Sequence, residues 1–140
     1  MNENTILDKT VKLISPILLT LAFVVFWRGH QLPGGGFIGG LVAGLAIILR
    51  SIPKEVDFPS LFIGTAGDRM LSFGLAISLF AALLGYFFGE AFFHGQWLPT
   101  FYIPLIGKIH LGTPLLFDFG VFILVTTFCV KTASHFWEIE

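Results

Sequence analysis

Asp118 is the acidic residue of this sequence that falls squarely inside a predicted apolar helix, which spans about residues 113–131. It lies roughly five residues into the helix, or about 7.5 Å along the axis at ~1.5 Å per residue. Placing a carboxylate among hydrocarbon costs about 2.5–3.5 kcal/mol on insertion scales. Asp118 is therefore either an ion or proton site, a partner for a basic residue of a neighbouring subunit, or a structural group stabilised by the positive N-terminal end of its own helix.

His30 and His110 each fall at the end of a predicted apolar segment. Histidine titrates near neutral pH, so either residue could relay protons, and either could equally be a solvated or capping group. Thr113 precedes Pro114, the pairing of N-cap and first helical residue that favours a helix start, and it is a further candidate beside an ion path. No histidine pair has helical spacing with a completing carboxylate, so we expect no metal site and no cofactor.

A glycine segment follows the first histidine and consists of Pro33, Gly34, Gly35, Gly36 and Phe37. It lacks the Lys-Ser/Thr pair of a phosphate-binding loop, and no strand precedes it. It is either a break in a helix with backbone groups near an ion path, or a tight turn that brings the next helix against a neighbour.

Small residues also repeat at four-residue spacing, a pattern that lets helix backbones approach closely in lipid. One stripe is formed by Gly36, Gly40 and Gly44, and another by Gly74, Ser78 and Ala82. The stripes pack either the predicted helices at 37–52 and 70–93 against each other or this chain against partner subunits.

The composition excludes several classes of protein. Of 140 residues, 55% are hydrophobic and only 12% are charged, about half the charged share of soluble domains. A soluble globular enzyme cannot cover its surface with so few charges. The net charge of −1 argues against a nucleic-acid binder, and one cysteine excludes an intramolecular disulfide framework.

The charged residues divide the chain into four apolar segments, which predicts an all-α membrane protein. The four transmembrane helices form a bundle within a single membrane domain of residues 1–140. We expect the helices at about residues 5–29, 37–52, 70–93 and 113–131, with a polar linker at 53–69 and a membrane-surface loop at 95–112.

Four spans place both termini and the 53–69 linker on one side of the membrane. That side carries six of the eight basic residues, namely Lys9, Lys12, Arg50, Lys54, Arg69 and Lys131. The positive-inside rule then predicts that both termini are cytoplasmic.

Two segments, Arg28–Leu41 (RGHQLPGGGFIGGL) and Ile109–Val121 (IHLGTPLLFDFGV), resemble the B subunit of Mrp-type (Mnh, Pha) multisubunit cation/proton antiporters. The resemblance covers nearly the whole chain. It departs from the family pattern at Pro114, where alanine is usual. The family's motif positions in this sequence are His30, Pro33, Gly34, Gly35, Gly36, Phe37, His110, Gly112, Thr113 and Asp118.

The resemblance implies an accessory subunit of a complex in the bacterial cytoplasmic membrane, related to the membrane arm of respiratory complex I. Such complexes exchange Na⁺ for H⁺, and the B subunit is needed for assembly and activity together with subunits A, C, D, E, F and G. Related B-like subunits occur in membrane-bound hydrogenase complexes. A self-sufficient homo-oligomeric four-span transporter, coupled through Asp118, is the other alternative.

Overall fold

The computed structural model describes residues 3–29, 34–54, 58–87, 101–103, 107–109 and 112–138 of the chain. Within these ranges the chain is predominantly helical. The helices are α1 (Glu3–Gly29), α2 (Gly35–Ser51), α3 (Gly64–Phe87) and α4 (Thr113–Glu138), and the short 3₁₀ helix η1 (Ile52–Lys54) continues α2. Two three-residue strands, β1 (Phe101–Ile103) and β2 (Gly107–Ile109), pair antiparallel between α3 and α4.

Three of the described helices, α1, α3 and α4, are long and apolar enough to cross a membrane. Helix α2 is equally apolar but has 17 residues, or about 25 Å at ~1.5 Å per residue, which is shorter than a hydrocarbon core of about 30 Å. The chain is therefore an all-α, multi-pass membrane protein in which one central helix is short.

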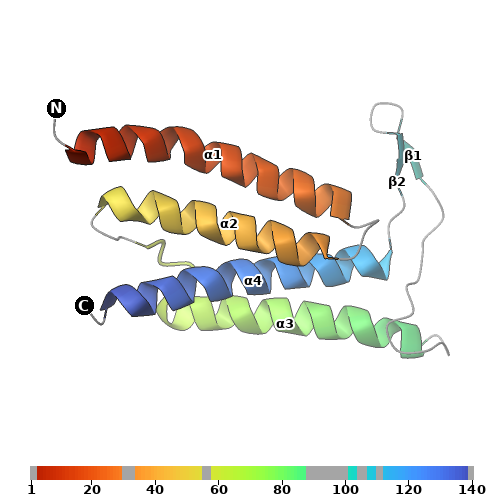
Figure 1. Cartoon of the computed structure of the whole chain (residues 1–140). Helices are drawn as coiled ribbons and strands as arrows, with labels where there is room; N and C mark the ends of the chain where they lie inside the picture. The colour runs from red at the N-terminus through yellow and green to blue at the C-terminus, as the bar shows by residue number, and fades with distance from the viewer. Residues whose placement is uncertain are drawn as a thin grey trace.

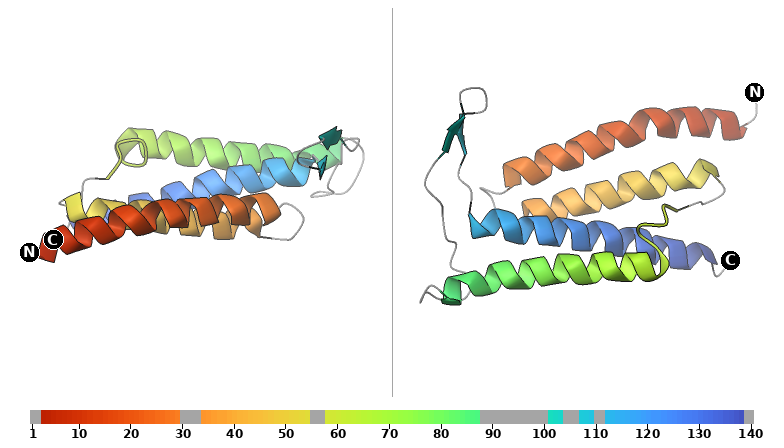
Figure 2. Two further views of the ribbon diagram at one scale, coloured as in Figure 1. Left: turned by 90° about the horizontal axis from the view of Figure 1, so that it is seen from above. Right: turned by 180° about the vertical axis from the view of Figure 1, so that it is seen from behind.

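The four helices lie side by side in the order α1, α2, α4, α3, so the bundle is an open row (Figures 1 and 2). Helices α2 and α4 run parallel, and each is antiparallel to its outer neighbour. Both termini lie at one end of the row, called here the terminal end (Figure 1). The other end, called the hairpin end, holds the N-termini of α2 and α4 and the β1–β2 pair.

Small residues and buried hydroxyls form the contact between α1 and α2. Ser15 of α1 donates a hydrogen bond of 3.1 Å to the backbone oxygen of Ala46 in α2, and both residues are fully buried. A Cβ atom built on Gly39 of α2 would lie 3.0 Å from the backbone oxygen of Ala22. The two helices therefore touch along their backbones.

Helix α3 approaches α4 in the same way on the opposite side of α4. A Cβ atom on Gly74 would lie 2.8 Å from the backbone oxygen of Gly120, and one on Gly120 would lie 2.7 Å from that of Gly74. Ser78 lies over Gly120 and donates its hydroxyl hydrogen to the Gly74 oxygen at 2.9 Å. The missing side chain of each glycine therefore leaves the space that the backbone of the other helix occupies.

The stripes of small residues do pack helices within the chain, but not against each other. The stripe of α2 and the stripe of α3 each contact α4, which lies between them. The alternative that the two stripes meet is wrong. Spacing of small residues indicates that a helix has a close neighbour, and it carries no information on which helix that neighbour is.

Two helices extend beyond their predicted bounds. Helix α3 begins at Gly64, which has a φ of +54°, so Asp68 and Arg69 are helical rather than part of a linker. Helix α4 continues past Lys131 to Glu138 because the residues after Lys131 include neither glycine nor proline. The predicted residues 88–93 of the third helix lie outside the described residues.

The segment expected to be a surface loop at 95–112 contains the β1–β2 pair. Phe101 pairs with Ile109, and Ile103 pairs with Gly107. Apolar and β-branched residues on either side of a short connection favour this pairing. The pair links the hairpin ends of α3 and α4 (Figure 1).

Gly120→Val tests the contact between α3 and α4. The added side chain would overlap the Gly74 backbone and Ser78, so we expect a loss of about 3 kcal/mol in stability. Thermal unfolding of the purified full chain in detergent measures the loss. Ala76→Val, which adds bulk on the exposed face of α3, is the control and should leave the unfolding temperature nearly unchanged. Equal unfolding temperatures for the two variants would contradict the contact.

Candidate functional site around Asp118

The start of α2 is set by a glycine in a backbone conformation that other residues avoid. Gly34 has a φ of +100° and no side chain to cap the helix, and its backbone oxygen accepts a hydrogen bond of 3.0 Å from the Ile38 N–H. A residue with a Cβ atom would be strained in this left-handed conformation. Gly35 and Gly36, expected to be part of an irregular break, are instead the first two residues of α2.

Gly36 brings α2 into direct contact with Asp118 of α4. A Cβ atom on Gly36 would overlap the backbone oxygen of Asp118 and would lie 2.8 Å from its Cα. The Asp118 residue is half-buried. Absence of a side chain at position 36 is therefore what allows the two helices to meet at the level of the carboxylate.

Two helix N-termini lie close to Asp118, rather than one. The carboxylate belongs to the second turn of α4, and its backbone touches the first turn of α2, which runs parallel to α4. The N-terminal end of a helix carries a partial positive charge of about half an elementary charge. The partial charges of both helix ends favour a negative charge at this level of the bundle.

An aromatic cluster lies on the terminal-end side of this carboxylate. Phe26 of α1 reaches past Gly39 to contact Phe122 and Phe119 of α4, with ring centroids 5.2 and 6.3 Å apart. Apolar rings on that side limit hydration of the α2–α4 contact.

The other glycines of the predicted stripe extend the same contact along α4. Cβ atoms on Gly40 and Gly44 would lie 2.9 Å from the Cβ of Val125 and 2.8 Å from the Cβ of Cys129. Thr126 donates its hydroxyl hydrogen to the Gly40 backbone oxygen at 3.2 Å. We call this contact of Gly36, Gly40 and Gly44 with α4 the glycine seam.

Two predicted site residues stand apart from the seam. Phe37 is half exposed and lies on the outer surface of the row. Thr113 is the first residue of α4, half-buried, and the five-residue separation from Asp118 puts the two on different faces of the helix. The structure therefore brings Asp118 against Gly36, whereas Gly40 and Gly44 contact Val125 and Cys129 further along α4.

His30, Pro33 and His110 lie outside the described residues, and so their predicted roles stay predictions. In the part of the chain that the structure describes, no three His, Cys, Asp or Glu side chains form a group that could hold a metal ion.

Sequence reasoning missed two residues that shape this region, Gly120 and Thr126. Gly120 is a glycine in an otherwise bulky stretch of α4, and this contrast with its aromatic neighbours is the signal that could have found it. Thr126 had no such signal, because threonine at a helical position usually bonds to its own helix.

The chain matches known proteins over most of its length. Residues 6–131 match the family model described as "Domain related to MnhB subunit of Na+/H+ antiporter". Proteins named "Putative antiporter subunit mnhB2" from Staphylococcus aureus strains Newman, JH1 and COL are each 38% identical to it over 122 residues, covering 86% of both chains.

The long apolar helices define the class as a multi-pass membrane protein. The sequence matches identify the family within that class. The chain belongs to the family related to the MnhB subunit of Na⁺/H⁺ antiporters.

Gly36→Val tests the close approach at Asp118. Valine would overlap the Asp118 backbone and push α2 away from α4, so we expect a loss of about 2–3 kcal/mol in stability. The unfolding temperature of the full chain in detergent measures it. Leu45→Phe adds volume on the exposed face of the same helix and should have little effect. If both variants unfold at the wild-type temperature, Gly36 does not set the helix separation.

Proposed function

We propose that this chain is an accessory membrane subunit of a multisubunit Na⁺/H⁺ antiporter, related to the membrane arm of complex I and needed for assembly and ion transport. The observation that carries the proposal is the family match over residues 6–131, which includes both sequence segments that resemble the B subunit. The relatives named mnhB2, which match this chain over 86% of both lengths, also support it.

The open row of helices supports a role inside a larger complex. Large apolar side chains are exposed on the outer helices, among them Leu13, Ile17 and Phe23 of α1 and Phe73 and Leu79 of α3. These surfaces need lipid or other membrane subunits as neighbours. We propose that the partners are antiporter subunits A, C, D, E, F and G together with membrane lipids, and that Na⁺ and H⁺ are the transported ions.

We propose that the complex lies in the bacterial cytoplasmic membrane with both termini of this chain in the cytoplasm. The four helices of the described residues and the common position of the two termini are compatible with this topology (Figure 1). Five basic residues of the described helices are at the terminal end, namely Lys9, Lys12, Arg50, Arg69 and Lys131, whereas Arg28 in the last turn of α1 is at the hairpin end. The positive-inside rule favours the cytoplasmic side for that end.

Asp118 has one of two roles in this proposal. It lies either beside an ion path entered from the hairpin end, or at an interface where its charge fixes a neighbouring subunit. Its position between two helix N-termini favours an ionised carboxylate in both cases. The glycine seam keeps that carboxylate at a fixed place relative to α2.

Co-expression experiments test the proposed function. In vesicles from a strain lacking its own antiporters, the complete set of subunits should show Na⁺-dependent proton movement, followed by the fluorescence of a pH-sensitive dye. The set without this chain, and this chain without the others, should each show none. Antiport by vesicles that contain only this chain would favour a self-sufficient transporter and overturn the proposal.

Asp118→Asn, expressed with the other subunits, separates the two roles of the carboxylate. If Asp118 belongs to the ion path, the complex assembles normally and antiport falls or its pH optimum moves. If the charge fixes an interface, co-purification of the other subunits is lost. Asp118→Glu keeps the charge and should retain more antiport and more co-purification of the other subunits than Asp118→Asn. Normal assembly with unchanged transport in the asparagine variant would contradict both roles.

A further inference from the structure

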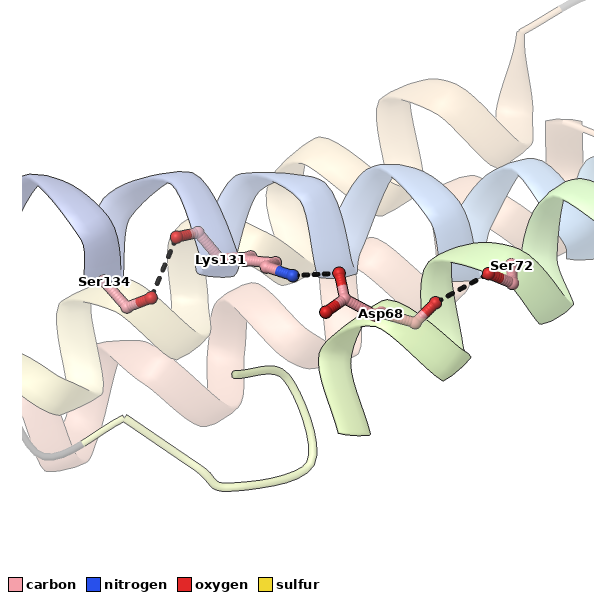
Figure 3. A network of polar contacts seen from close by, with 4 residues as sticks. All are labelled: Asp68, Ser72, Lys131 and Ser134. Carbon is pink, nitrogen blue, oxygen red and sulfur yellow. Dashed lines mark hydrogen bonds and ion pairs between the residues drawn. The ribbon is translucent and has the colours of Figure 1, made fainter. Parts of the chain in front are cut away.

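An ion pair at the terminal end joins two of the apolar helices. The Lys131 ammonium of α4 contacts the Asp68 carboxylate of α3, and both residues lie within segments long and apolar enough to span a membrane. Figure 3 shows the pair bridging the two helices, with Ser72 and Ser134 on either side of it. The serine hydroxyls donate to the backbone oxygens of Asp68 and Lys131 at 2.9 and 2.8 Å.

The side chains of the two partners differ in their exposed fraction. The side chain of Lys131 is 17% exposed, whereas that of Asp68 is 65% exposed. The aliphatic part of Lys131 passes Gly67 of α3, where a Cβ atom would lie 3.6 Å from the lysine Cδ. The lysine is thus enclosed between helices, and the carboxylate that neutralises it stands at the edge.

Lys131 lies near the terminal end of the membrane-spanning part of α4. It follows Thr113 by 18 residues, about 27 Å at ~1.5 Å per residue, close to the full thickness of a hydrocarbon core. Helix α4 continues beyond it to Trp137, which packs on the buried Phe58 with ring centroids 6.1 Å apart. Lys131 therefore lies just inside the terminal edge of the core, and without a counter-charge its enclosed ammonium would be drawn out toward the membrane surface.

We propose that Asp68 sets the depth of α4 in the membrane by neutralising Lys131. Asp68 is a positioning residue in this role. Because α4 is one continuous helix, the depth of Lys131 also fixes the depth of Asp118, 13 residues earlier on the same helix. The inference depends on α4 spanning the membrane and does not depend on the ion that the complex transports.

The unequal exposure of the partners predicts an unequal response to substitution. Asp68→Asn leaves an enclosed ammonium without a counter-charge, which is the costly way to break such a pair. Lys131→Met leaves a carboxylate that lies in the first turns of α3 at the terminal edge of the row, where water can reach it, and it should be tolerated. The double variant Asp68→Asn/Lys131→Met should behave like Lys131→Met. An ordinary surface ion pair would instead give two small and similar effects.

Cys129, the single cysteine of the chain, is two residues from Lys131 and reports the depth of α4. The measurement is the rate at which a membrane-impermeant maleimide labels Cys129 of this chain, co-expressed with the other antiporter subunits, in inverted and right-side-out vesicles. In Asp68→Asn, movement of Lys131 toward the terminal surface should raise the rate several-fold. The increase should occur in inverted vesicles if the termini are cytoplasmic.

The controls separate a change of depth from a general loss of structure. Asp68→Glu should restore the wild-type rate, as should the double variant. Asp8→Asn breaks the exposed pair between Asp8 and Lys12, in which both side chains are at least a third exposed, and it should leave the Cys129 rate unchanged.

Three results would overturn the proposal. They are an unchanged labelling rate in Asp68→Asn, a Lys131→Met variant that is labelled as fast as Asp68→Asn, and a double variant that fails to return to the wild-type rate. If Asp68→Asn does not accumulate in the membrane, recovery of the protein level in the double variant supports the proposal, and failure to recover contradicts it. Loss of antiport with normal Cys129 labelling would leave the proposed antiporter function standing and reject the depth mechanism.

Discussion

Close backbone contact on both sides of α4 is the constraint on which the rest of the structure depends. Gly36, Gly40 and Gly44 of α2 fit against one side of α4, and Gly74 of α3 fits against Gly120 on the other. Hydrocarbon offers little hydrophobic gain for helix association, because lipid tails are as apolar as the side chains. Contact energy then comes from van der Waals packing and interhelical hydrogen bonds, and both require the helices to be close.

The close contacts with α4 also determine which helices lie beside its charged residues. The parallel run of α2 and α4 places two positive helix ends at the level of Asp118, while the antiparallel run of α3 and α4 brings Asp68 to Lys131 near the other end. One helix thus carries an acid near its start and a base near its end. Each of these charges faces a different neighbour of α4, which is the packing centre of the row.

The sequence predicted the apolar helices and the family but not the neighbours. Apolar segments bounded by charges identify membrane helices directly, since hydrocarbon excludes charged residues. Helix ends were less predictable: Asp68 was assigned to a linker, because a charged residue marks the edge of an apolar run whether or not the helix continues through it. Pairing of Asp68 with Lys131 could not be read from the sequence, since 63 residues separate them.

The candidate site around Asp118 was also predictable only in part. Asp118 and Gly36 each stand out locally, the acid by its apolar surroundings and the glycine by its four-residue spacing. Their contact depends on α2 running parallel to α4, which follows from the chain crossing once more between them. Two parallel helices that start at the same membrane surface present their N-termini together. A carboxylate in the second turn of α4 then lies near the N-terminal end of α2 as well as that of its own helix, and both ends favour a negative charge. A substitution that separates the two helices removes the contribution of α2 without altering the acid.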